Sequence, residues 1–128
     1  MGNLTENFST WEFACKCCEK LPTPEELKPL SEALQQLHDH IQADRGEEIP
    51  IHINCGYRCP RHNREVGGSE TSRHMIFMAA DCTALPLTPI ELAKYAEQIP
   101  AFEQSGIGIY DTFTHLDVNR DRRWRKYK

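Results

Sequence analysis

Residues 72–82 read Ser-Arg-His-Met-Ile-Phe-Met-Ala-Ala-Asp-Cys, and this stretch decides how the chain folds. Residues 75–80 within it are all apolar, which is typical of a strand that is buried on both faces. The run therefore predicts a buried strand over Met75–Cys82. His74 and Asp81 bracket the run, so a loop and the strand that it feeds can bring an imidazole and a carboxylate to one place.

A long amphipathic helix is predicted upstream of this strand. Residues 23–26, Thr-Pro-Glu-Glu, combine a capping Thr, a Pro at the first helical position and a Glu three residues after the cap. Pro29 predicts either a kink or the true start of the helix at that point. His38 and His40 are expected on the solvated surface. The apolar stripe that faces the core recurs at spacings of three and four, at Leu27, Leu30, Leu34, Leu37 and Ile41.

The remaining segments complete the predicted fold. Isoleucines at 49, 51 and 53 alternate with Pro50, His52 and Asn54, as in a half-buried strand, and a loop marked by Pro60 and Gly67-Gly68 follows. Residues 88–98 repeat the helix-start pattern, and residues 107–109 and 114–118 form a hairpin around a turn at Asp111-Thr112. This order predicts one small α+β domain over residues 1–128, with a largely antiparallel sheet and flanking helices.

The composition excludes several classes of protein. Hydrophobic residues make up 39% and charged residues 27% of the chain, as in an ordinary globular domain. The net charge of -4 argues against capture of a phosphate backbone, so no nucleic-acid partner is expected. No apolar run approaches the ~20 residues of a membrane span. Residues 1–13 lack the features of a signal peptide, so we expect a protein that is made in the cytoplasm. We also expect it to be a monomer.

Six cysteines leave two interpretations open. Without an export signal they are more often reduced thiols or metal ligands than disulfides. A structural zinc site built from the 15–18 segment, Cys-Lys-Cys-Cys, together with Cys55 and Cys59 is only a loose fit to the usual paired spacing. The alternative is that these residues, like Cys82, are small buried hydrophobes or form a single disulfide.

A second group of polar residues lies in the predicted hairpin. His115 and Asp117 share one face of a strand while Leu116 and Val118 share the other, because side chains alternate along a strand. A catalytic zinc site takes three ligands of the His, Asp or Glu type and leaves a fourth position for water. By spacing alone, each of these residues could equally be a hydrogen-bonded histidine or a solvated acid.

The motif Ser72-x-His74-x-x-Phe77-x-Ala79-x-Asp81, followed at a distance by His115, resembles that of the M15 zinc peptidases, the D-Ala-D-Ala carboxypeptidases and phage endolysins. The resemblance extends over essentially the whole chain. It includes the opening at 8–15, with its Trp-Glu-Phe, the stretches 54–60, 62–63 and 66–68, the ending at 106–110 and 113–118, and Trp124. It implies the fold of the hedgehog and D-Ala-D-Ala peptidase group, within the compact branch of the family.

The resemblance also implies roles for particular residues. His74, Asp81 and His115 would be the ligands of a zinc ion, the expected cofactor. Arg58 would stabilise the oxyanion that develops on the substrate carbonyl, with a structural ion pair as the alternative. Ser72 would hydrogen-bond substrate or orient the ligand loop. Cys55 and Cys59 would pack beneath this turn.

Two positions depart from the family pattern. Other branches carry an acid or a histidine two or three residues before the last ligand, where Thr112 and Phe113 stand here. Asp117 is the first candidate for the general base, with Asp111 second, and an equal alternative is that Asp117 orients a ligand or Arg58. Phe77 replaces a glycine of the motif. It is expected either to bury its ring from ordinary strand geometry or to narrow the zinc cleft.

The function implied is that of a hydrolase, a zinc metallopeptidase that cuts D-amino-acid-containing peptides of bacterial peptidoglycan. It would be a carboxypeptidase or an endopeptidase of cell-wall degradation, and its substrate a stem or cross-link peptide. The short chain suits a phage endolysin or a virion component that reaches the wall after release. The alternative is a non-catalytic, zinc-stabilised binding or structural module.

The carboxyl-terminal run is basic. It is expected either to be a solvated end whose Trp packs on the core or to attract anionic wall polymers. The run comprises Arg120, Arg122, Arg123, Trp124, Arg125, Lys126, Tyr127 and Lys128.

Overall fold

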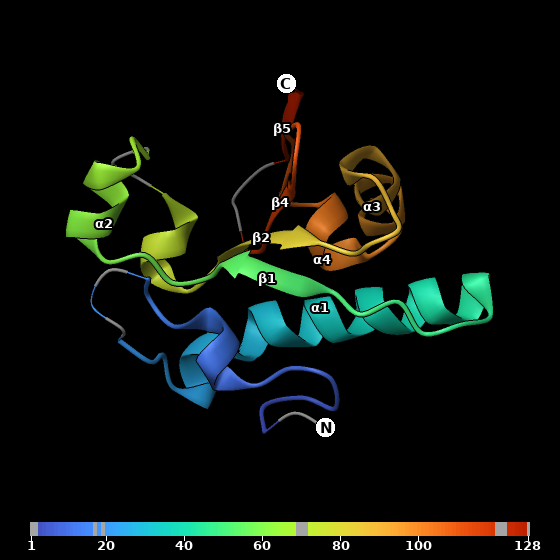
Figure 1. Cartoon of the computed structure of the whole chain (residues 1–128), viewed down its shortest axis with the longest axis horizontal. Helices are drawn as coiled ribbons and strands as arrows, with labels where there is room; N and C mark the ends of the chain where they lie inside the picture. The colour runs from blue at the N-terminus through green and yellow to red at the C-terminus, as the bar shows by residue number, and fades with distance from the viewer. Residues whose placement is uncertain (1–2, 17, 19, 69–71, 120–122, 128) are drawn as a thin grey trace.

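The computed structural model describes residues 3–16, 18, 20–68, 72–119 and 123–127 (Figure 1). Two 3₁₀ helices, η1 and η2, accompany helices α1–α4 and strands β1–β5. In chain order the elements are η1 (Thr10–Phe13), α1 (Pro24–Arg45), β1 (His52–Cys55), α2 (Pro60–Glu65), η2 (Arg73–Ile76), β2 (Ala79–Thr83), α3 (Pro89–Ala96), α4 (Pro100–Glu103), β3 (Gly106–Ile109), β4 (Thr114–Asp117) and β5 (Trp124–Tyr127).

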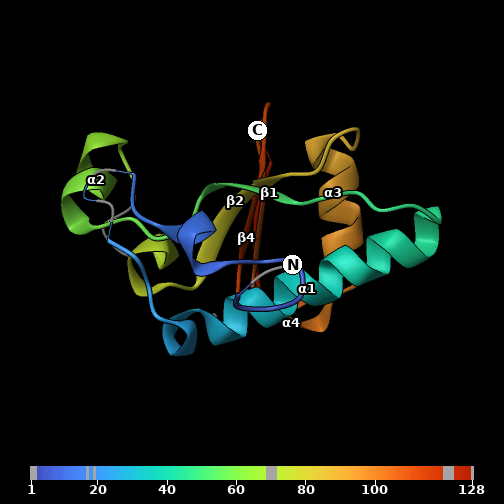
Figure 2. The same ribbon diagram turned by 60° about the horizontal axis from the view of Figure 1, so that its bottom comes forward.

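The five strands form one sheet in the order β1-β2-β4-β3-β5. All neighbouring pairs are antiparallel except β3 and β5, which are parallel. The α+β class and the largely antiparallel sheet are thus confirmed. The helix α3 lies on one side of the strands, while α2 and η2 lie on the other (Figures 1 and 2). No helix in the described ranges is both long enough and apolar enough to cross a bilayer.

Helix α1 begins where the capping pattern predicts. The Thr23 side chain accepts a hydrogen bond from the Glu26 amide at 3.2 Å, and the Glu26 carboxylate accepts one from the Thr23 amide at 2.9 Å. The helix starts at Pro24 and runs through Pro29, so the latter is not its start. The expectation of a solvated His38 is wrong, because its side chain is buried with Nδ1 3.1 Å from Asp39. His40 contacts Gln98 at 2.6 Å.

The predicted strand over Met75–Cys82 is correct only in its second half. The first half forms η2, the chain then turns through Phe77 in the left-handed region with φ 64°, and β2 begins at Ala79. Ser72 starts the turn, because its side chain accepts a hydrogen bond from the His74 amide at 3.2 Å. Ile76 is 48% exposed, so an unbroken apolar run here is not an unbroken buried strand.

Besides the 3₁₀ helices η1 and η2, three elements were not predicted: α2, in the segment expected as a loop, α4, and β5 in the basic tail. Strand β5 is held by Arg125, whose guanidinium donates to both carboxylate oxygens of Glu97 at 2.7 and 2.8 Å and to the Ser105 carbonyl at 3.0 Å. The pKa of Glu97 is lowered, first by these hydrogen bonds. Arg125 therefore has a structural role. The described residues do not include Arg120, Arg122 and Lys128 of the basic carboxyl-terminal run, nor Cys17.

Candidate active site

Register across the sheet brings together the polar residues of three strands. Asp81 on β2 pairs directly with His115 on β4, and Cys55 on β1 pairs with Asp81 from the other side. On the far side of β4, Gly108 of β3 faces His115. Because directly opposed residues lie on the same face of a sheet, this row places a thiol, a carboxylate and an imidazole side by side.

His74 reaches the same row from η2. Its Nε2 lies 3.3 Å from Asp81 Oδ1, and its Nδ1 lies 2.7 Å from the Gly56 carbonyl oxygen. A carbonyl oxygen can only accept, so Nδ1 donates to it and Nε2 faces the carboxylate. The ring is only 1% exposed and meets His115 edge-on, with 5.2 Å between ring centroids.

The buried carboxylate of Asp117 orients His115. Its Nδ1 lies 3.0 Å from Asp81 Oδ1 and its Nε2 lies 2.8 Å from Asp117 Oδ2. Asp117 is 0% exposed, and the Ser105 hydroxyl donates to its Oδ1 at 2.7 Å. Gly106 opposite leaves the space for this carboxylate, because a Cβ there would lie 2.4 Å from both oxygens.

The pKa values of the three central groups reflect their proximity. Burial raises the pKa of Asp81, but hydrogen bonds from His115 and His74 outweigh it and hold that pKa well below its usual range. Burial lowers the pKa of each histidine, but neighbouring carboxylates outweigh this effect and raise the pKa. Asp81 does so for His74, and Asp117 and Asp81 do so for His115. We call His74, Asp81 and His115 the histidine cluster.

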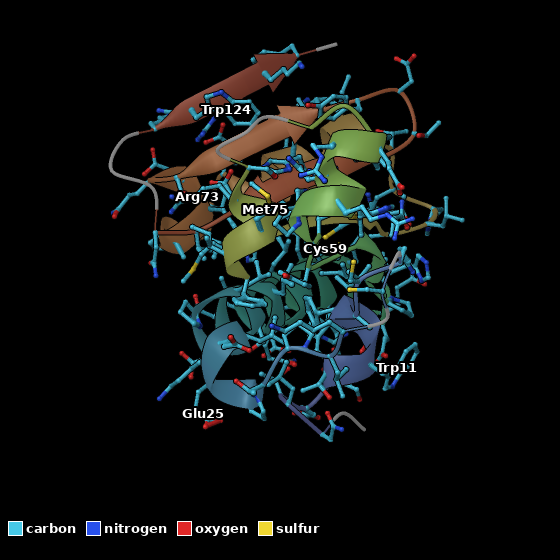
Figure 3. The ribbon with its side chains drawn as sticks, turned by 90° about the vertical axis from the view of Figure 1, so that its left-hand side faces the viewer. Trp11, Glu25, Cys59, Arg73, Met75 and Trp124 are labelled. Atoms are coloured by element: carbon cyan, nitrogen blue, oxygen red, sulfur yellow. The ribbon has the colours of Figure 1, made fainter. Side chains whose placement is uncertain are left out.

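The histidine cluster opens into a cleft of about 520 Å³. Arg58 forms part of its wall: the guanidinium donates to Ser72 Oγ at 3.0 Å, and the backbone amide donates to the His74 carbonyl at 3.1 Å. The face that carries Trp124 and Arg73 is turned to the viewer in Figure 3. The lining residues include three cations, Arg58, Arg73 and Lys126, and three aromatic residues, Tyr110, Phe113 and Trp124. The cleft therefore suits an extended ligand with a carboxylate.

The structure brings most of the predicted site residues to this cleft. Its lining includes Arg58, Ser72 and all members of the histidine cluster, whereas Asp117 lies behind His115 and takes no part in the lining. Asp111 lines a separate hollow beside Pro86. This arrangement favours the orienting role of Asp117 over that of general base.

Phe77 does not narrow the cleft. Its ring stacks on that of Tyr57, with 4.6 Å between centroids and 23° between planes, and packs against the core. The expectation of ordinary strand geometry is wrong, since Phe77 occupies the left-handed region that favours glycine. A glycine at this position would adopt the same conformation without the conformational cost that phenylalanine meets.

Comparison with known proteins identifies the family. A family model described as Peptidase M15 matches residues 6–117. The chain belongs to the M15 peptidase family. A search of curated proteins found no match.

The donor atoms of this M15 peptidase fit a metal ion. Ligand atoms of Cys55, His74 and Asp81 lie within 4.8 Å of one another, and His115 Nδ1 contacts the same carboxylate. Two imidazole nitrogens and one carboxylate oxygen that face each other are the usual protein share of a catalytic zinc site. The remaining nitrogen of each ring is held by an oxygen acceptor, as in metal-binding histidines generally. The histidine cluster, with the Cys55 thiol as a further donor beside it, is therefore a candidate metal-ligand set.

Sequence reasoning missed four contributors to the site. The Gly56 carbonyl and Ser105 hold His74 and Asp117, and no local pattern marks either. Trp124 meets His115 edge-on at 5.5 Å, which depends on the undetected strand β5. Cys55 was expected beneath the turn. Strand alternation alone would put Cys55 on the same face as Ile53, and only the irregular register between Ile53 and Cys55 pairs it with Asp81, so no sequence signal assigned it to this row.

Proposed function

We propose that this M15 peptidase is a zinc enzyme that hydrolyses D-amino-acid-containing peptides of bacterial peptidoglycan. The observation that carries the proposal is the convergence of His74 Nε2 and His115 Nδ1 on one oxygen of Asp81, at the floor of a cationic cleft. When bound, zinc would supply Lewis acidity, which polarises a peptide carbonyl and lowers the pKa of water so that hydroxide is available near neutral pH.

The residues of the chain divide the remaining work. The Arg58 guanidinium, fixed by Ser72, provides a permanent positive charge for the oxygen that becomes negative during attack. Ser72 Oγ accepts from both Arg58 and the His74 amide, so it ties the oxyanion site to the ligand turn and keeps its own proton for the substrate. Asp117 accepts from His115 Nε2 and so keeps Nδ1 turned to the cleft.

Lys126 and Arg73 line the same cleft, where a carboxylate of a stem or cross-link peptide would meet opposite charge. We propose that the enzyme is a monomer that acts on cell-wall peptides and not on nucleic acid. We place its action at the wall, after release from the cytoplasm by lysis or as part of a virion.

A second candidate is a zinc-stabilised binding or virion structural module without turnover. It is favoured by one observation: among the described residues that line the cleft, Asp81 is the only carboxylate, and it belongs to the histidine cluster. A binding module needs no proton acceptor, whereas hydrolysis does.

Defined peptides decide between the candidates. The purified protein, loaded with zinc, is incubated with stem peptides ending in D-Ala-D-Ala, with cross-linked dimers and with whole peptidoglycan, and products are identified by mass spectrometry. We expect cleavage that a chelator abolishes and that His115→Ala lacks, while all-L peptides of the same sequence stay intact. Binding of the same peptides without cleavage would favour the module, and neither binding nor cleavage would overturn both candidates.

A further inference from the structure

Three cysteine thiols outside the cleft converge on one point. The Sγ atoms of Cys15, Cys18 and Cys59 lie within 4.8 Å of one another, although 44 positions separate the first from the last. Cys59 is the capping residue of α2, and Cys15 follows η1 in the amino-terminal segment. Figure 3 shows Cys59 where α2 meets that segment. We call these three residues the thiol cluster.

Backbone amides point at the sulfur atoms of the thiol cluster. The Cys59 amide donates to Cys15 Sγ at 3.4 Å, and the His62 amide donates to Cys59 Sγ at 3.4 Å. The Lys20 amide hydrogen-bonds Cys18 and lowers its pKa, but burial and the two neighbouring thiols outweigh it and raise that pKa. Each sulfur thus has a neutral donor that favours thiolate, while the three crowd one another.

Cys15 and Lys20 are joined independently of any ligand, because the Cys15 amide donates to the Lys20 carbonyl at 3.0 Å. Cys15 and Cys18 have Cys-x-x-Cys spacing in the sequence. That spacing is usual for a pair of zinc ligands. The third sulfur belongs to Cys59 at the start of α2, so a metal ion bound here would join two segments that are distant in sequence.

We propose that the thiol cluster binds a second zinc ion, in a structural site distinct from the histidine cluster. Tetrahedral zinc with bonds of about 2.3 Å to sulfur holds its sulfur ligands roughly 3.8 Å apart, which is within the spread of these three atoms. A disulfide would use two of the three thiols and leave the third beside it. A metal ion satisfies all three, and water or a further side chain completes the coordination.

The thiol cluster lies between the amino-terminal segment and helix α2, and this location indicates its structural role. The Phe13 carbonyl, just before Cys15, accepts from the Tyr57 amide at 2.9 Å, and the Lys20 ammonium lies 5.6 and 5.8 Å from the ring centroids of Tyr57 and Phe77. Helix α2 leads into Val66, Gly67 and Gly68, which line the cleft. Zinc in the thiol cluster would therefore fix the amino-terminal segment to the wall of the active site.

Metal content and thiol protection test the site separately from the proposed function. Protein purified under reducing conditions with Zn²⁺ is analysed for metal, alongside His115→Ala, Cys18→Ser and Cys59→Ser. We expect His115→Ala to keep one equivalent of zinc and Cys18→Ser to lose one relative to the parent. Co²⁺ bound to the double variant His115→Ala, Cys55→Ser should show thiolate-to-metal charge-transfer absorption, and that band should be missing once Cys18→Ser is added, because Cys55 is the thiol nearest the histidine cluster. Cys82→Ala is the matched control, because it removes a buried thiol outside the thiol cluster and should change neither result.

Alkylation of the parent protein covers the case in which a variant does not fold. Zn²⁺ should protect three thiols that iodoacetamide modifies after chelation, and peptide mapping should assign them to the thiol cluster. The proposal is overturned if His115→Ala holds no zinc, if these thiols react equally with and without Zn²⁺, or if the mass of the protein is two units low and chelator has no effect, as for a disulfide. Loss of peptidase activity alone bears on the histidine cluster and not on this site.

Discussion

The histidine cluster and the thiol cluster differ in what holds their donor atoms in place. Asp81 and His115 are directly paired in the middle of a five-stranded sheet, and a buried carboxylate fixes the second imidazole. The thiols come from the amino-terminal segment and a helix cap, and backbone amides donate to the sulfur atoms of Cys15 and Cys59. Mixed oxygen and nitrogen ligands that open into a cleft suit catalysis, whereas sulfur ligands that join segments suit structure. The donor atoms of the histidine cluster are thus held mainly by sheet pairing, and those of the thiol cluster by hydrogen bonds of a loop segment and a helix cap.

The largest effect expected is on turnover, through Arg58. Arg58→Ala should lower kcat/KM by about a hundredfold or more, because a charge aimed at the developing oxyanion is lost. The zinc content of both clusters and the melting temperature of the variant should stay close to those of the parent protein. Arg61→Ala is the matched control, since that exposed arginine of α2 pairs only with Glu65 among the contacts described. A large fall in melting temperature for Arg58→Ala would assign Arg58 a structural role instead.

The next effect concerns Asp117 and metal affinity. Asp117→Asn should weaken zinc binding at the histidine cluster by about ten- to a hundredfold, because the group that orients His115 loses its charge. The thiol cluster should keep its affinity in the same variant, which competition with a chelating dye can measure. Asp111→Asn serves as control and should leave both affinities unchanged. If Asp117→Asn abolishes cleavage while zinc affinity is unaltered, Asp117 acts as the base after all.

A pH series on metal-free protein tests the charges of the histidine cluster. The pKa of His115 is raised in the fold, so its contribution to stability is complete below about pH 6.5 and is lost as pH rises through the folded pKa. The pKa of Asp81 is lowered, so its contribution is present above about pH 4 and is lost on acidification. The stability difference between the parent and His115→Asn should therefore be larger at pH 5.5 than at pH 8.5, changing by at most about 1.4 kcal/mol per pH unit.

Urea denaturation in the presence of chelator measures this difference. The thiol cluster supplies the contrast, because Cys18→Ser should not show the same decline between pH 5.5 and pH 8.5. A difference for His115→Asn that grows with pH would contradict the assigned charges.

The smallest effect separates backbone conformation from packing at Phe77. Phe77→Ala and Phe77→Gly both lose the ring that stacks on Tyr57, but glycine alone also relieves the positive φ. Both variants should be less stable than the parent, and the glycine variant should be more stable than the alanine variant by about 1 kcal/mol. Thermal and urea unfolding measure this. Equal stability of the two variants would show that the backbone relaxes away from the left-handed region.

Short-range features could be predicted from the sequence. Helices α1 and α3 begin at Thr23 and Thr88, because their capping boxes join residues only three positions apart. Strand alternation placed His115 and Asp117 on one face, and the family motif selected the ligand types. Each of these signals depends on neighbouring residues, whose hydrogen bonds and side-chain directions repeat with the period of the local structure.

Tertiary structure alone decided the rest. His38 is buried although Asp39 and His40 follow it, and β5 pairs with β3 and is tied to Glu97 through Arg125. Asp117 is buried against Ser105, which precedes β3, and against Gly106, the first residue of β3. The convergence of Cys59 on Cys15 and Cys18 likewise has no local signature. In each of these cases the partners are distant in sequence, so their contact depends on sheet register and loop packing, which form only when the whole chain has folded.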